Sequence, residues 1–165
     1  MQLQVNPAPM WKFGTLWALL LLAACAGETP GTTAVPFAPL RHGKTMALRA
    51  RTDFVVARTQ SEWDAAWQLP STDQHGSNPG GPSVPPPVQF SDAMVLGVVF
   101  PAAPDSCTSV EIVAVSQTTR QLVVEYRGHR PQRDEGCMAA FFAPYVFVTV
   151  ASTGREVTFV EVPAQ

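Results

Sequence analysis

Cys25 is the residue whose surroundings most clearly specify a chemistry. It ends the run Leu22-Ala23-Ala24-Cys25, which matches the lipobox of bacterial lipoproteins. Small residues before a cysteine let the extended chain enter a signal peptidase, and the thiol at the cleavage site becomes a thioether to diacylglycerol. Each buried methylene group of the attached chains adds about 0.8 kcal/mol of membrane affinity. The pattern therefore predicts a lipid anchor at Cys25.

The segment before Cys25 supports this interpretation. Residues 13–24 are mostly apolar, and Lys12 precedes them. A membrane-spanning helix needs about 20 apolar residues, so this shorter stretch is typical of a signal peptide, and we predict that residues 1–24 are removed. An ordinary secretory signal with an incidental cysteine is the alternative. Ala26 stands where lipoproteins of the inner membrane often carry Asp, and this favours the outer membrane.

Cys107 and Cys137 are the other two cysteines. In an oxidising compartment an even pair most simply forms a disulfide. A redox-active pair is the alternative, but the sequence has no CxxC motif and no Lys or His pattern that would lower the pKa of a thiol. We therefore expect a structural disulfide between Cys107 and Cys137.

No other combination of side chains points to catalysis. His42, His75 and His129 are far apart in the sequence, and it contains no HxH, HExxH, GxSxG or Gly-rich phosphate-binding motif. The formal charge is −2, whereas a nucleic-acid-binding protein needs a basic face. We expect no catalytic site, no metal ion, no cofactor and no nucleic-acid partner.

Two neighbouring segments could form the rim of a protein-binding site. Residues 127–136 mix arginine with acidic residues, and arginine is enriched in protein interfaces. Residues 141–145 are rich in aromatic side chains, which could form an exposed patch. The plainer alternatives are a solvated connection and core packing. The candidate partner-binding residues are Arg130, Arg133, Phe141, Phe142 and Tyr145.

The elements that must position these residues are expected to begin after residue 45. Residues 26–40 are mostly Ala, Gly, Thr and Pro, so we predict that residues 25–45 comprise the lipidated cysteine and a flexible tether, with the folded domain at 46–165. Residues 61–67 predict a short helix that begins at Ser61 as N-cap and buries Trp63 and Trp67 on one face. Residues 94–100 are almost continuously apolar and predict a strand buried on both faces.

The rest of the domain is expected to be short strands. Residues 108–115 alternate, with Val110, Ile112 and Ala114 on one face, and residues 122–126 follow after a turn. Residues 145–150 and 156–160 flank a turn that contains Gly154, which predicts an antiparallel hairpin. Residues 69–87 predict a long irregular loop. The order indicates one small α+β domain, mainly antiparallel β-sheet with one short helix.

Three segments together resemble the PrcB-like family, which is named for a lipoprotein subunit of a bacterial surface protease complex. They are S-x-W-x-x-x-W at residues 61–67, F-S-x-x-M-V-L at 90–96 and P-Y-x-x-V at 144–148. The similarity spans roughly residues 53–161. The family usually carries a Gly-Gly-Tyr turn where this chain has residues 104–108, which include Cys107.

The resemblance implies a non-catalytic accessory role. We therefore expect a lipid-anchored envelope protein, on the outer membrane, that binds and stabilises a partner protein such as a protease. The alternative is a small-molecule or glycan-binding lipoprotein in which Trp63, Trp67 or the aromatic residues at 141–145 line a pocket.

The lipid anchor is directly testable. Cells that express the protein and are fed a labelled fatty acid should incorporate the label into the wild-type chain, because Cys25 receives a diacylglyceryl group that carries fatty acids. The Cys25→Ala variant should carry no label. An unlabelled wild-type chain, or label that persists in Cys25→Ala, would contradict the prediction.

Overall fold

The computed structural model describes residues 31–46, 49–71, 84–131 and 136–164. Within these ranges the chain forms eight strands and one helix. The elements in chain order are β1 (Thr33–Ala34), β2 (Phe37–Thr45), β3 (Asp53–Ala57), α1 (Gln60–Ser71), β4 (Ala93–Val99), β5 (Ser109–Gln117), β6 (Gln121–His129), β7 (Ala143–Ala151) and β8 (Glu156–Glu161).

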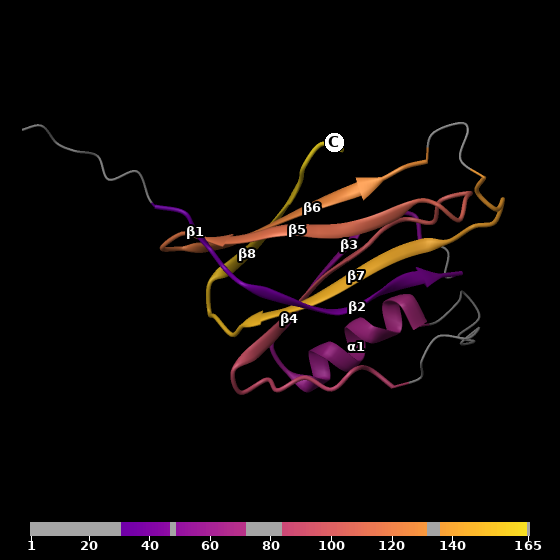
Figure 1. The fold of residues 1–165 in the computed structure, drawn as a ribbon. Coiled ribbons are helices and arrows are strands. Elements are labelled where there is room, and N and C mark those ends of the chain that lie inside the picture. Colours follow the sequence, from indigo (N-terminus) through magenta and orange to yellow (C-terminus); the bar gives the residue numbers. More distant parts are fainter. Residues whose placement is uncertain (1–30, 47–48, 72–83, 132–135, 165) are drawn as a thin grey trace, which may run out of the picture.

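The strands form two four-stranded sheets, with α1 beside the second sheet (Figure 1). Sheet A has the order β1-β5-β6-β8, and sheet B has the order β2-β7-β4-β3. Every pairing is antiparallel except that between β6 and β8, which is parallel. The fold is therefore a single small α+β domain, mainly antiparallel β-sheet with one short helix, as the sequence predicted.

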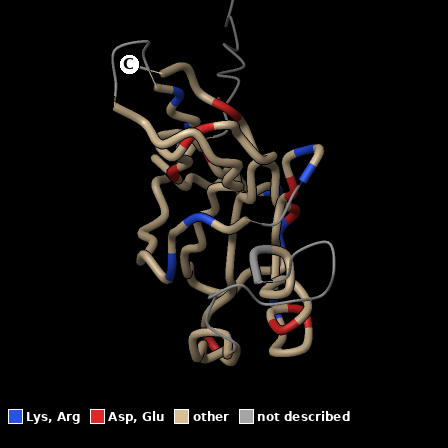
Figure 2. The backbone as a smooth tube through the Cα atoms, turned by 90° about the vertical axis from the view of Figure 1, so that its right-hand side faces the viewer, with Lys and Arg blue, Asp and Glu red and all other residues tan. Residues whose placement is uncertain are grey.

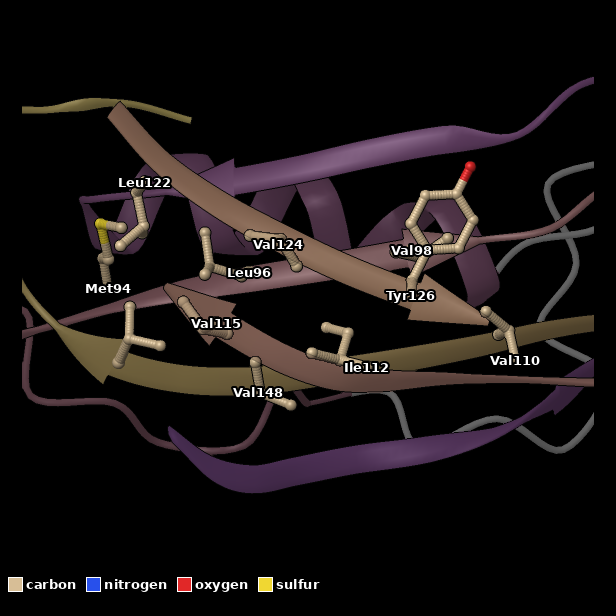
Figure 3. Close-up of a cluster of buried hydrophobic side chains, with 11 residues drawn as sticks. Met94, Leu96, Val98, Val110, Ile112, Val115, Leu122, Val124, Tyr126 and Val148 are labelled. Carbon is tan, nitrogen blue, oxygen red and sulfur yellow. The ribbon is translucent and has the colours of Figure 1, made fainter. Parts of the chain in front are cut away.

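The predicted central strand is confirmed as β4, which is buried on both faces. Met94, Leu96 and Val98 face the core between the sheets, whereas Val95 and Val99 pack toward α1. Figure 3 shows the core between the sheets, where side chains of β4 and β7 meet those of β5 and β6. Strand alternation thus gives β4 two buried faces, which explains its almost uninterrupted apolar sequence.

A second core lies between sheet B and α1, and aromatic side chains dominate it. Trp63 and Trp67 are both buried, as predicted, with ring centroids 5.3 Å apart. The ring of Phe147 on β7 packs edge-on to Trp63 at 4.9 Å. Gly97 on β4 makes room for it, because a Cβ atom there would lie 2.2 Å from Cδ1 of Phe147.

The prediction of Ser61 as the N-cap of α1 is wrong. The hydroxyl oxygen of Thr59 accepts from the amide of Glu62 at 3.2 Å, and the Glu62 carboxylate accepts from the amide of Thr59 at 3.1 Å. This reciprocal pair is a capping box, in which the cap lies three residues before the acidic residue. The amide of Arg58 also donates to Glu62, at 2.7 Å, and this bond is the largest cause of the lowered pKa of that carboxyl.

The predicted tether extends too far along the chain. Residues 33–34 form β1 and residues 37–45 form β2, while residues 25–30 lie outside the described part. Strand β2 covers the edge of β7 along its length, from the pair of Phe37 with Val150 to that of Thr45 with Ala143. It is an edge strand, where Pro39 is tolerated, so the strand depends on the exposed edge of β7 more than on its own sequence pattern.

The predicted hairpin of residues 145–150 and 156–160 is also wrong. Strand β7 already has β2 and β4 as neighbours, so neither of its edges is open to the next strand. The chain instead crosses to sheet A, where β8 pairs in parallel with β6. A short turn that contains Gly154 thus connects two sheets rather than two paired strands.

The alternation predicted for residues 108–115 is correct only in its first half. The register of β5 against β6 shifts between Ile112 and Ala114, which marks a β-bulge. An extra residue reverses the faces beyond it, so Val115 joins Val110 and Ile112 in the core in place of Ala114.

Replacing Gly97 by Ala tests the packing of the aromatic core. The added methyl group would collide with the Phe147 ring, so we expect Gly97→Ala to lower the free energy of unfolding by about 1–3 kcal/mol. Urea unfolding of the purified protein measures this. Gly154→Ala is the control, because no atom lies within 4 Å of a Cβ at that position. Equal stability of the two variants would show that Phe147 does not pack against β4 as described.

Candidate functional site

One end of the sandwich, which we call the loop end, gathers three connections. They are residues 49–52 between β2 and β3, residues 100–108 between β4 and β5, and residues 130–131 and 136–142 between β6 and β7 (Figure 1). The amide of Ala102 donates to the carbonyl of Arg49 at 3.1 Å, and Ala103 pairs with Phe142 in an isolated β-bridge. Backbone bonds therefore join these connections directly.

The expected disulfide between Cys107 and Cys137 is present at the loop end, with an S–S distance of 2.08 Å and Cα atoms 5.5 Å apart. Two hydrogen bonds lie beside it. The amide of Ser106 donates to the carbonyl of Met138 at 3.0 Å, and the amide of Met138 donates to Oγ of Ser106 at 2.8 Å. The segment after Cys137 is thus held to the connection between β4 and β5 by covalent and polar contacts.

Asp105 organises the same connection. Its carboxylate accepts from the amide of Thr108 at 2.6 Å, from the Thr108 hydroxyl at 2.9 Å and from the amide of Cys107 at 2.9 Å. These bonds, the Thr108 amide first, lower the pKa of the Asp105 carboxyl, and the positive charge of Lys44 acts in the same direction. Nζ of Lys44 donates to the carbonyl of Ser106, so β2 also contacts this connection.

The predicted rim residues fall into different environments. Arg130 is exposed at the loop end, whereas Arg133 lies outside the described residues. The side chain of Phe141 is 59% exposed. Phe142 is partly buried, and its backbone pairs with that of Ala103. The structure therefore brings Arg130, Phe141 and Phe142 to one end of the molecule.

Tyr145 is buried and therefore does not belong to the predicted rim. It is only 6% exposed, and its ring contacts Trp67 edge-on at 6.5 Å and Phe147 at 5.7 Å. Tyr145 lies two residues before Phe147 on β7, so both side chains face α1. The core-packing alternative was thus right for Tyr145, which cannot contact a partner in this fold.

Two exposed methionines were missed in the sequence. Met138 is 61% exposed and lies in the connection between β6 and β7, and Met46 is 56% exposed and directly follows β2. A signal for Met138 was available, because it directly follows a cysteine that a disulfide was expected to fix. Methionine adapts its shape to a partner surface, so an exposed methionine three residues before Phe141 is an apolar feature suited to binding.

Two shallow depressions adjoin the loop end and share Phe100 and Arg130. The larger has a volume of about 570 Å³ and is bordered by the C-terminal segment Val162 to Ala164. The Phe100 ring forms its wall by lying over Gly128, where a Cβ atom would be 2.6 Å from Cε2. The smaller, about 400 Å³, is lined by Asp105 and Thr108 among others.

The described residues include no group of three or more His, Cys, Asp or Glu side chains that could hold a metal ion. His42 lies on β2 in sheet B and His129 lies on β6 in sheet A, while His75 is outside the described ranges. Lys and Arg are scattered among acidic residues rather than gathered over one face (Figure 2). No helix in the described part of the chain is long and apolar enough to cross a membrane.

The tryptophans that could line a glycan-binding pocket are not at the surface. Trp63 is 0% exposed and Trp67 is 1% exposed. The indole Nε1 of Trp63 donates to the carbonyl of Pro86 at 2.9 Å, so its polar atom is used within the fold. A sugar stacks on exposed aromatic faces, which these two side chains do not offer.

These features define a β-sandwich with one covering helix and a disulfide-braced loop end. Comparison with protein-family models, with curated proteins and with solved structures gives no match to this chain.

Removing the disulfide should measure how strongly it braces the loop end. Cys107 and Cys137 are 30 residues apart, and a loop of this length corresponds to about 3.5 kcal/mol of stabilisation in the chain-entropy model. We expect the double variant Cys107→Ser/Cys137→Ser to unfold at lower urea concentration, with a loss near that value. Wild-type protein in reductant is the matched control and should lose the same amount of stability. Unchanged stability in both would contradict a structural role.

Proposed function

We propose that this protein is a non-catalytic lipoprotein of the bacterial envelope that binds and stabilises a partner protein through its loop end. The observation that carries this proposal is the pair of exposed apolar side chains, Met138 and Phe141, on a segment braced by the Cys107–Cys137 disulfide. The exposed Arg130 adds a cation on a nearby connection of the same end.

The bracing supports binding because it lowers the entropic cost of forming an interface. A mobile loop loses conformational freedom when a partner orders it, whereas a segment already held in place loses less. Met138 is held by two hydrogen bonds to Ser106, and Phe142 is held by its bridge to Ala103. Phe141 therefore projects from a fixed backbone, and a fixed aromatic side chain is typical of residues that dominate binding energy.

The position of the N-terminal segment also supports the proposal. Thr33 of β1 pairs with Gln117, the last residue of β5, so the described chain begins at the end of the sandwich opposite the loop end (Figure 1). The nine residues of β5 separate the two ends by roughly 30 Å. With a lipid at Cys25, the loop end would point away from the membrane, where a partner protein can approach it.

The class of partner is proposed from the PrcB-like resemblance. That family is named for a subunit of a surface protease complex, so a protease is the first partner to test. We also propose an outer-membrane location, because Ala26 stands where lipoproteins of the inner membrane often carry Asp. The glycan-binding alternative loses support, because Trp63 and Trp67 are buried.

Affinity capture from detergent-solubilised membranes tests the proposal. A partner recovered with the wild-type chain should be lost with Arg130→Ala/Phe141→Ala, because that variant removes the cation and the aromatic side chain of the loop end. The steady-state level of the partner should also fall when the gene for this protein is deleted.

The control is Arg120→Ala. Arg120 is also exposed, but it lies in the turn between β5 and β6 at the opposite end. Recovery of the same partner with the wild-type protein, with Arg130→Ala/Phe141→Ala and with Arg120→Ala would contradict binding through the loop end. Failure to recover any partner with the wild-type chain would contradict the proposed function itself.

A further inference from the structure

Strand β8 presents an open edge. It lies at the end of sheet A and pairs only with β6, and no described strand pairs with its other side. Its sequence, Glu-Val-Thr-Phe-Val-Glu, carries charge only at its two ends and contains no Lys, Pro or Gly, and its register shows no bulge. Natural proteins usually protect an edge strand with such features, because an unprotected edge pairs readily with another chain.

The backbone groups on this open edge can be assigned. The amide of Val162 donates to the carbonyl of Tyr126 on β6 at 2.8 Å, so even-numbered residues of β8 direct their backbone groups toward β6. Because these directions alternate along a strand, Val157, Phe159 and Glu161 direct their N–H and C=O groups away from β6. These three residues therefore form the template for an added strand.

We propose that a second copy of this chain occupies the edge, with the two β8 strands antiparallel about a twofold axis at Thr158. In this register Val157 of one copy lies opposite Phe159 of the other and exchanges backbone hydrogen bonds with it. Arg155 lies opposite Glu161 of the second copy on the same face of the sheet. The twofold axis repeats each pair, and the two sheets A become one continuous sheet.

Charge complementarity selects this register. Moving the axis to Phe159 would place Val157 opposite Glu161 and leave Arg155 opposite Pro163. Moving it to Val157 would place Arg155 opposite Phe159. Of these three neighbouring registers, which all keep the side chains on their proper faces, only the one centred on Thr158 pairs opposite charges. Opposite charges across strands stabilise a pair, whereas a charge opposite an apolar residue adds nothing comparable.

The guanidinium of Arg155 has hydrogen-bonding capacity left for this contact. Its Nη1 donates to Oγ1 of Thr153 at 3.2 Å and its Nε is buried within its own chain, so Nη2, which makes no hydrogen bond among the described residues, is the atom that a second copy can reach. A carboxylate is the acceptor that a guanidinium binds best. Among the described residues Glu161 forms no ion pair within its own chain.

Two exposed apolar side chains at the edge would also become more buried in the dimer. Phe54, on the neighbouring edge strand β3, is 48% exposed, although its ring stacks on Phe159 at 4.7 Å. Val160 on β8 is 43% exposed. In the proposed register Val157 of the second copy packs beside Phe159 and Phe54, and Glu156 of the second copy covers Val160.

Cysteine cross-linking of the full-length protein in membranes tests the register. Residues on the twofold axis face each other as a non-hydrogen-bonded pair with Cα atoms about 4.5 Å apart, within the range of a disulfide. Thr158→Cys should therefore give a reductant-sensitive dimer on a non-reducing gel. Val160→Cys is the control, because its two copies would lie roughly 13 Å apart. Monomer with Thr158→Cys, or equal dimer with both variants, would overturn the proposal.

A charge exchange in the Thr158→Cys background tests the ion pair. Arg155→Glu or Glu161→Arg alone should reduce the cross-linked dimer about five-fold, because two pairs are lost by symmetry. The two changes together should restore it, which a mere folding defect would not do. Failure of the double exchange to exceed the single variants would overturn the register. A cross-linked product that contains a different protein would overturn the assignment to a second copy.

Discussion

The structure depends on the burial of both faces of the β4–β7 pair. Each strand alternates large apolar side chains between two cores, so one face must be covered by sheet A and the other by α1. Phe147 shows how closely this is arranged, because its ring occupies the space left by Gly97 and contacts both tryptophans of the helix. A strand pair of this kind cannot be stable alone, so the covering elements are required by it.

This constraint also determines the two ends of the molecule. Because β2 and β4 occupy both edges of β7, β8 must join sheet A and the chain must cross between the sheets. The N-terminal segment uses β1 on sheet A and β2 on sheet B, and thus closes one side of the sandwich. The connections at the loop end need no core of their own, because the Cys107–Cys137 disulfide braces them, and they are free to expose apolar side chains.

The features that could be predicted from the sequence are those that depend on patterns within a few residues. The apolar run at 94–100 and the tryptophan spacing at 61–67 reflect burial and helical periodicity, which act within a few residues. The strands at 33–45 could not be predicted in this way, because the open edge of β7, about 100 residues later, induces them. At the candidate site, Phe141 and Tyr145 look alike in sequence, but Phe141 lies in the connection before β7 and is exposed, whereas Tyr145 lies on β7 and is buried.

Hydrogen–deuterium exchange of the intact protein, followed residue by residue, tests the central role of the doubly buried strands most directly. Amides in the most deeply packed elements exchange only through global unfolding, whereas those at sheet edges open locally. We expect the paired amides of β4 and β7 to exchange most slowly, with free energies of opening equal to that of global unfolding, and those of the edge strand β3 to exchange faster. Faster exchange in β4 and β7 than in β3 would contradict it.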